Sequence, residues 1–309
     1  MATERILAAL DVGVVQRARP ARSRVLSDYW ALTKPEINFL IAIATVAAFC
    51  LGSPQSVAYF PWILLLNTLL GTVLVASGAS TLNQLIERNF DAQMRRTARR
   101  PISAGRIKPV HALAFGTLLS VAGGFYLAAE VRPAASLLAL LTLAAYLLLY
   151  TPLKRRTPMC TLVGAFPGAM PVLIGYVAAA GKLDLGAWLL FSILFLWQFP
   201  HFMAIAWMYR EDYERAGFRV LPTGTEKAQF VGWQAALPAL ALVSVTAAPI
   251  TLRQANSFFV AGTLWLSLAF LYFAASFALV RTRESARWLL LASVVYLPLV
   301  FLLQVLARV

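Results

Sequence analysis

Three polar side chains recur every four residues at the end of a long apolar segment. Asn83, Glu87 and Asp91 have this spacing, which places them on one face of a helix over about two turns. Two carboxylates and an amide form a set of hard oxygen donors. Such a set suits Mg²⁺, which typically binds one or two carboxylates and takes its other ligands from water and phosphates. The segment therefore predicts a site for a metal-bound phosphate compound.

Basic residues follow these carboxylates directly. Four arginines lie between residues 95 and 100, and a second basic run, KRR, occupies residues 154–156. Guanidinium groups are good bidentate partners of phosphate, but such runs also form helix-supporting ion pairs or set membrane topology. Because the first run meets carboxylates at one place, we favour a phosphate site. The predicted phosphate-binding residues are Arg96, Arg100, Lys154 and Arg155.

A third segment, residues 197–222, contains one of the two histidines. His201 lies within an apolar stretch, where an ionisable group is a functional candidate. A hydrogen-bonded core histidine is the alternative, and imidazole can also bind haem iron. Asp212 lies eleven residues later, about three helical turns away on a similar face. The other histidine, His111, is expected near a membrane interface.

The elements that carry these groups are predicted to be membrane-spanning helices. Of 309 residues, 60% are hydrophobic and 13% are charged, whereas soluble domains have about 25% charged residues. This composition excludes a single soluble domain and a disordered chain, and two cysteines exclude a disulfide framework. Segments of about 20 apolar residues can cross a bilayer. Nine are predicted, at 37–54, 62–87, 109–129, 133–151, 159–180, 185–208, 230–250, 257–280 and 286–307.

The positions of the basic residues predict the orientation of the helices. If the N-terminus is cytoplasmic, only four of the 27 Lys and Arg residues fall outside, namely Arg132, Lys182, Arg253 and Arg308. This is the charge bias of a multi-pass membrane protein, so the net charge of +14 does not indicate a nucleic-acid partner. Residues 1–28 have no long apolar run and are expected to form a flexible basic cytoplasmic tail. Residues 29–309 are expected to form the membrane domain.

Metal-binding oxygens and phosphate-binding cations beside apolar helices indicate an amphiphilic diphosphate as ligand. Its head would bind at the inner interface, and its hydrocarbon tail would lie between the helices. Prenyl diphosphates have this chemistry.

Three segments carry the pattern of a known family. Residues 83–101 read NQLIERNFDAQMRRTARRP, residues 150–158 read YTPLKRRTP, and residues 197–222 include WQFPHF and DYERAG. With these motifs, and over nearly everything after about residue 28, the chain resembles the protoheme IX farnesyltransferases, a branch of the UbiA-type intramembrane prenyltransferase superfamily. It departs from the superfamily's second aspartate-rich motif, because Ala204 and Met208 precede Asp212 where carboxylates are usual.

The resemblance implies an all-α bundle of about nine helices around a central cavity. It implies farnesyl diphosphate and haem B as substrates and haem O as product, with Mg²⁺ bound to the diphosphate by Glu87, Asp91 and Asp212. Asn83 would complete the catalytic set. His201 would contact haem, either as an axial ligand or through a propionate.

The expected location is a bacterial inner membrane, since the short tail favours it over the mitochondrial one. Haem A synthase or oxidase assembly proteins are candidate partners. Three alternatives stay open: prenylation of an aromatic quinone precursor, ion-coupled transport, and a non-catalytic role in assembling haem-copper oxidases. The absence of a convincing internal repeat counts against transport.

Overall fold

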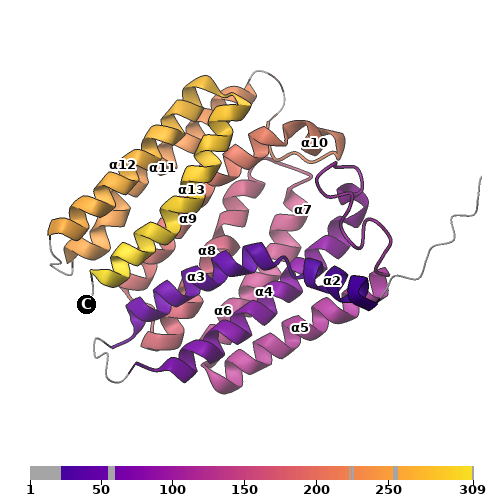
Figure 1. Cartoon of the computed structure of the whole chain (residues 1–309), viewed down its shortest axis with the longest axis horizontal. Coiled ribbons are helices and arrows are strands. Elements are labelled where there is room, and N and C mark those ends of the chain that lie inside the picture. Colours follow the sequence, from indigo (N-terminus) through magenta and orange to yellow (C-terminus); the bar gives the residue numbers. More distant parts are fainter. Residues whose placement is uncertain (1–21, 55–59, 223, 225, 253–256, 308–309) are drawn as a thin grey trace, which may run out of the picture.

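The structure, a computed structural model, describes residues 22–54, 60–222, 224, 226–252 and 257–307. Every regular element in these ranges is helical (Figure 1). Residues 1–21 of the predicted tail, Arg253 and Arg308 lie outside the described residues. The elements are α2 (Arg22–Leu32), α3 (Pro35–Gly52), α4 (Trp62–Asp91), α5 (Pro109–Glu130), α6 (Pro133–Ala144), η2 (Ala145–Tyr150), α7 (Thr151–Leu153), α8 (Cys160–Ala180), α9 (Leu185–Met208), α10 (Arg210–Arg215), α11 (Glu226–Leu252), α12 (Ser257–Val280) and α13 (Arg283–Leu306).

Within the described part of the chain, nine helices are long and apolar enough to cross a membrane. They are α3, α4, α5, the continuous span of α6, η2 and α7, and then α8, α9, α11, α12 and α13. The predicted number of spans is confirmed. The second span is longer than predicted, because α4 continues to Asp91.

Local signals fix where these helices begin. Proline is the first residue of α3, α5 and α6, where its missing N–H leaves no helical bond unmade. The Asp184 side chain caps α9 by accepting hydrogen bonds from the N–H groups of Gly186 and Ala187. These signals are local, so they place the helix starts without reference to the rest of the fold.

Helices α8 and α9 form the centre of the bundle. Buried residues make up 67% and 61% of their apolar 18-residue stretches, against at most 44% in those of the other spans. Helix α8 packs against α3, α6 and α9, while α9 packs against α11 and α13. Figure 1 shows α4, α5 and α6 on one side of this pair and α11, α12 and α13 on the other. The long helix α4 is therefore held mainly by α5 and α3.

The predicted boundary at residue 28 falls inside helix α2. The Asp28 carboxylate pairs with Arg106 at 2.9 Å, and the Gln84 side chain donates to the carbonyl of Leu32 at 2.9 Å. Residues 22–28 are helical, and the Asp28 contact joins the end of this stretch to the membrane domain. The prediction for residues 1–21 remains a prediction.

Close contact between α4 and α5 depends on glycine. A Cβ on Gly78 would overlap Ser120 Oγ and would lie 2.7 Å from the Gly116 carbonyl oxygen. Small residues allow helix backbones to approach closely in membranes. Since α4 carries the acidic face, this contact sets where that face lies.

Gly78→Ala is expected to lower the stability of the protein in detergent by about 1–3 kcal/mol, the usual cost of overpacking. The measurement is the midpoint of thermal aggregation or of denaturant unfolding. Gly262→Ala is the matched control, because its new Cβ would meet Leu303 at an ordinary 3.4 Å. An equally stable Gly78→Ala protein would show that α4 and α5 have room to separate.

Candidate active site at the basic end of the bundle

The last turns of α4 carry the predicted acidic face, and that face points inward. Asn83, Glu87 and Asp91 are 1%, 5% and 0% exposed. All three belong to one continuous helix, so the four-residue spacing does place them on one face. Carboxylates this well buried need partners of opposite charge.

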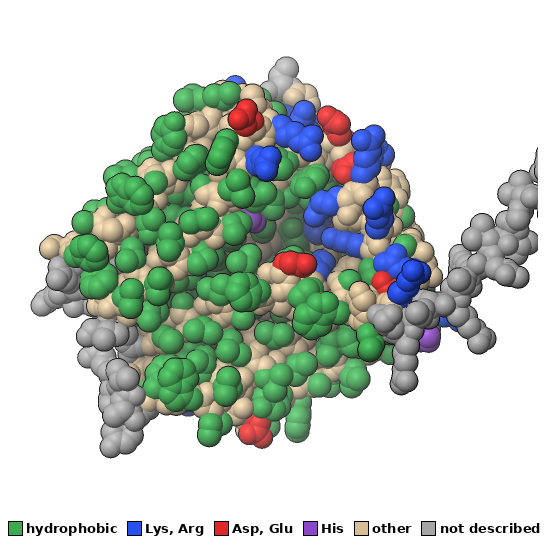
Figure 2. All heavy atoms as spheres, in the orientation of Figure 1, with side chains coloured by type: hydrophobic (Ala, Val, Ile, Leu, Met, Phe, Trp, Pro, Cys, Tyr) green, Lys and Arg blue, Asp and Glu red, His purple; other side chains and the backbone are tan. Residues whose placement is uncertain are grey.

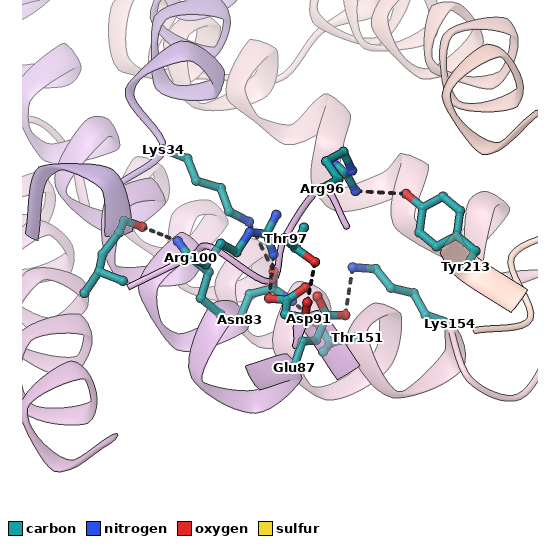
Figure 3. Close-up of polar contacts among 12 residues, drawn as sticks. Lys34, Asn83, Glu87, Asp91, Arg96, Thr97, Arg100, Thr151, Lys154 and Tyr213 are labelled. Atoms are coloured by element: carbon teal, nitrogen blue, oxygen red, sulfur yellow. Dashed lines mark hydrogen bonds and ion pairs between the residues drawn. The ribbon is translucent and has the colours of Figure 1, made fainter. Parts of the chain in front are cut away.

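Two cations from different segments supply that charge (Figure 3). Lys154 Nζ lies 2.9 Å from Glu87 Oε1, and Arg100 Nη1 lies 2.6 Å from Asp91 Oδ2. Lys154 directly follows α7, whereas Arg100 belongs to the segment after α4. Burial lowers the pKa of Lys154, but the adjacent Glu87 carboxylate outweighs it and raises that pKa well above its usual value. Lys154 is therefore a permanent cation at this site.

One carboxylate oxygen in the cluster is left without a partner. Asp91 Oδ1 is fully enclosed and makes no hydrogen bond to any described residue. The backbone carbonyl of the same residue accepts a 2.9 Å hydrogen bond from Thr97 Oγ1, which folds the following segment back over the helix end. A buried oxygen with unused lone pairs costs free energy and is available to a bound ligand or ion.

Lys34 is a third cation at the cluster, and the sequence reasoning missed it. Its Nζ donates to Asn83 Oδ1 at 3.3 Å, and the Asn83 amide donates to Thr151 Oγ1 at 3.1 Å. Burial, followed by repulsion from Arg100 and Lys154, lowers the pKa of Lys34 to about 7. Lys34 also has a left-handed backbone, with φ of 51°, and such non-glycine residues gather at functional sites. Its place immediately before the first span was the available signal.

The remaining two predicted phosphate-binding residues lie against aromatic rings. The Arg96 guanidinium is 5.1 Å from the Tyr209 ring centre and donates to the Tyr213 hydroxyl at 3.3 Å. Figure 3 shows it directed away from the carboxylates. Arg155 is exposed, with its guanidinium 4.1 Å from the Phe90 ring centre. The structure therefore separates the four predicted cations into two at the carboxylates and two outside that cluster.

Asp212 lies in α10 and pairs with a neighbour on its own helix. Its Oδ1 is 3.0 Å from Arg215 Nη1. Among the residues that the structure describes, no three His, Cys, Asp or Glu side chains are placed to hold one metal ion. The structure thus brings Glu87 and Asp91 together but does not add Asp212 to them.

His201 lies within α9 and contacts α13. Its Nδ1 is 2.7 Å from Ser293 Oγ, and its ring stacks on that of Trp197 with 4.7 Å between ring centres. His111 is exposed at the start of α5, in agreement with the expected interfacial position. Of the two histidines, His201 is therefore the one that can contact a ligand inside the bundle.

The surface above the cluster is hollowed and asymmetric in charge. Figure 2 shows Lys and Arg side chains gathered on one side of the hollow and mostly hydrophobic side chains on the other, where a histidine is also visible. An amphiphile with an anionic head can meet both surfaces at once. The arrangement can bind a diphosphate at the cations and place an apolar body against the helices.

Comparison with known sequences places the chain among prenyl-transferring proteins. Residues 40–301 match the UbiA prenyltransferase family. The protoheme IX farnesyltransferase of Solibacter usitatus is 45% identical over 289 residues, which cover 92% of this chain and 99% of that protein. The protein of the same name from Salinibacter ruber is 43% identical over 279 residues, covering 89% and 96%.

Solved structures show the same fold. A structure of digeranylgeranylglyceryl phosphate synthase superposes with a TM-score of 0.72 and 17% identity, covering 92% of this chain and 98% of that one. A UbiA homologue from Archaeoglobus fulgidus bound to GPP and Mg²⁺ gives a TM-score of 0.62 with 13% identity, covering 89% and 99%.

Proposed function

This chain belongs to the UbiA prenyltransferase family, and we propose that it transfers the farnesyl group of farnesyl diphosphate to a vinyl group of haem B. The vinyl carbon forms a bond to the farnesyl C1 as the C1–oxygen bond to diphosphate breaks. Water then adds to the cation left beside the porphyrin ring and releases one proton. The products are haem O and diphosphate. The named relatives support this choice of substrates.

The buried acidic pair surrounded by three cations is the observation that carries the proposal. Asp91 has a free enclosed oxygen, and Glu87 lies one turn away on the same face. Hard oxygens with this spacing fit Mg²⁺, so these two residues would hold it. A Mg²⁺ ion bound there with the diphosphate would neutralise part of the charge on the leaving group.

The cations of the cluster would bind the remaining diphosphate oxygens. Arg100 and Lys154 already lie within 3 Å of the carboxylates, and Lys34 reaches the same cluster through Asn83. Positive groups fixed where negative charge develops lower the barrier to ionisation. Arg96 and Arg155 would attract the anion to the site, and Asp212 would approach only after α10 moves. His201 would contact haem.

The orientation of the bundle follows from the same charges. We assign the end with α2, α10 and the acidic cluster to the cytoplasm, because basic residues gather on cytoplasmic loops. The bacterial relatives favour the inner membrane as location. Haem A synthase or oxidase assembly proteins would be its protein partners.

Lys34 predicts a pH dependence for substrate capture. Because its pKa is lowered to about 7, Lys34 carries a charge below that pH and loses it above. The pH dependence of kcat/KM reports ionisable groups of the free enzyme. We expect kcat/KM to fall about tenfold between pH 6 and pH 9, because about this factor corresponds to the free energy of one hydrogen bond to a charged group. Lys34→Arg should remove this alkaline loss, since guanidinium stays protonated. An unchanged pH profile in Lys34→Arg would exclude Lys34 as its source.

The reaction itself is tested with purified protein in detergent, haem B, farnesyl diphosphate and Mg²⁺. Mass spectrometry should detect a porphyrin heavier by one farnesyl group plus one water, dependent on both the diphosphate and Mg²⁺. A folded protein that leaves haem unchanged, but prenylates a hydroxybenzoate or naphthoate, would overturn the choice of acceptor.

A further inference from the structure

The His201 imidazole is fixed in orientation by two neighbours. Trp197, one turn earlier on α9, stacks on it with an angle of 23° between the ring planes. The indole N–H of Trp197 donates to the Ser293 carbonyl oxygen at 2.8 Å, so the stacking ring is itself held. Ser293 Oγ lies 2.7 Å from His201 Nδ1. The plane and the rotation of the imidazole are therefore both set.

The hydrogen bonds of Ser293 also decide which imidazole nitrogen carries the proton. Ser293 Oγ donates to the carbonyl oxygen of Leu290 at 2.6 Å. A hydroxyl has one proton, so toward His201 this oxygen can only accept. His201 Nδ1 is then the protonated nitrogen, and in the neutral imidazole that an apolar span favours, Nε2 carries a lone pair.

His201 Nε2 has no hydrogen-bond partner among the described residues. It is not one of the side-chain atoms that are both fully enclosed and unpaired, so it borders open space. A histidine needed only for packing does not require a fixed tautomer with its lone pair left free. A haem propionate could not bind this nitrogen, because an unprotonated nitrogen offers a carboxylate no donor. Haem iron does bind such a lone pair.

We propose that Nε2 of His201 is an axial ligand of the haem iron and that Ser293 is its positioning residue. Histidines that bind metals usually donate their other N–H to a hydrogen-bond acceptor, which is the role of the Ser293 hydroxyl here. Ligation of the iron would anchor the porphyrin through its centre and leave a vinyl group at its edge free to react. The inference rests on the proposed function, because it takes haem B as the substrate.

The first test is haem binding without farnesyl diphosphate. Purified protein is titrated with haem B, and the ferrous complex is examined by resonance Raman spectroscopy. We expect an iron–histidine stretching band that shifts when the protein contains ¹⁵N-labelled histidine. His201→Gly should lose the band, and added imidazole should restore an iron–nitrogen band. His111→Ala is the matched control, since it removes the only other histidine and should retain the band.

The second test concerns Ser293. Ser293→Ala should keep the iron–histidine band but shift its frequency, and it should weaken haem binding by about 10–100-fold, as removal of such partners does. Ser293→Thr keeps the hydroxyl and should restore both. A purely structural role for Ser293 would change protein yield or thermal stability without moving the band.

The outcomes separate this inference from the proposed function. If wild-type protein makes haem O and the His201→Gly complex has an unchanged spectrum, the ligation is wrong and the function stands. If the His201-dependent band is present but no farnesyl is transferred, the ligation stands and the function is wrong. If the wild-type protein binds no haem, both are overturned.

Discussion

Asp91→Asn is expected to lower kcat/KM for farnesyl transfer by about 10³-fold while the helix bundle stays folded. The substitution keeps the size of the side chain but removes the charge that the unpaired Oδ1 would offer to a metal-bound diphosphate. Losing one fixed group that stabilises developing charge costs about 10²–10³-fold. Glu87→Gln should have an effect of the same order. The measurement is product formation by mass spectrometry at several Mg²⁺ and farnesyl diphosphate concentrations.

Circular dichroism and elution volume are the two controls that distinguish a loss of activity from a loss of fold. The backbone carbonyl of Asp91, which holds Thr97, is kept in the asparagine variant, and Arg100 is partly exposed and can turn to water. Circular dichroism and elution volume should therefore match the wild-type protein. If either amide variant retained near-full activity, Glu87 and Asp91 would not be the metal site.

Lys154→Ala should reduce farnesyl transfer by about 10²-fold, whereas Arg156→Ala should leave it unchanged. The two residues lie in the same basic run. Lys154 reaches Glu87 at 2.9 Å, but Arg156 is exposed. The expected loss is that of one fixed cation facing the leaving group. Initial rates should be measured at saturating haem B, with farnesyl diphosphate varied.

Removing Lys154 alone leaves Glu87 buried and unpaired, which can destabilise a protein by about 3–5 kcal/mol. The double variant Glu87→Gln with Lys154→Met removes both charges and should recover thermal stability without recovering activity. Equal losses in Lys154→Ala and Arg156→Ala would mean that the run acts through its total charge. The specific contact with Glu87 would then be irrelevant to catalysis.

The position of Lys154 links the acidic cluster to the segment after α10. Its carbonyl oxygen accepts a 2.7 Å hydrogen bond from the backbone N–H of Arg219. Nearby, the Phe90 and Phe218 rings pack edge to face with their centres 5.8 Å apart. The segment that follows α10 is thus joined both to the end of α4 and to Lys154. A shift of α10 toward bound diphosphate would alter the Lys154–Arg219 hydrogen bond and the Phe90–Phe218 contact.

The sequence alone determined the elements and the chemistry of α4. Membrane spans are predictable because a bilayer demands about 20 apolar residues in a row and because backbone groups in lipid must bond within their own helix. The acidic face was predictable for a similar reason, since residues four apart on one helix share a face whatever surrounds it. Both depend on periodicity along a single segment.

Only the tertiary structure decided which charged groups meet. Lys34, Arg100 and Lys154 come from three separate segments, and the sequence offers no reason to prefer Arg100 and Lys154 over Arg96 and Arg155, which lie outside the cluster. The tautomer of His201 likewise depends on Ser293, which lies 92 residues further along the chain. Electrostatic and hydrogen-bond energies depend on distance in space. Packing between distant helices therefore selects the charged groups at the site from a larger set of similar residues in the sequence.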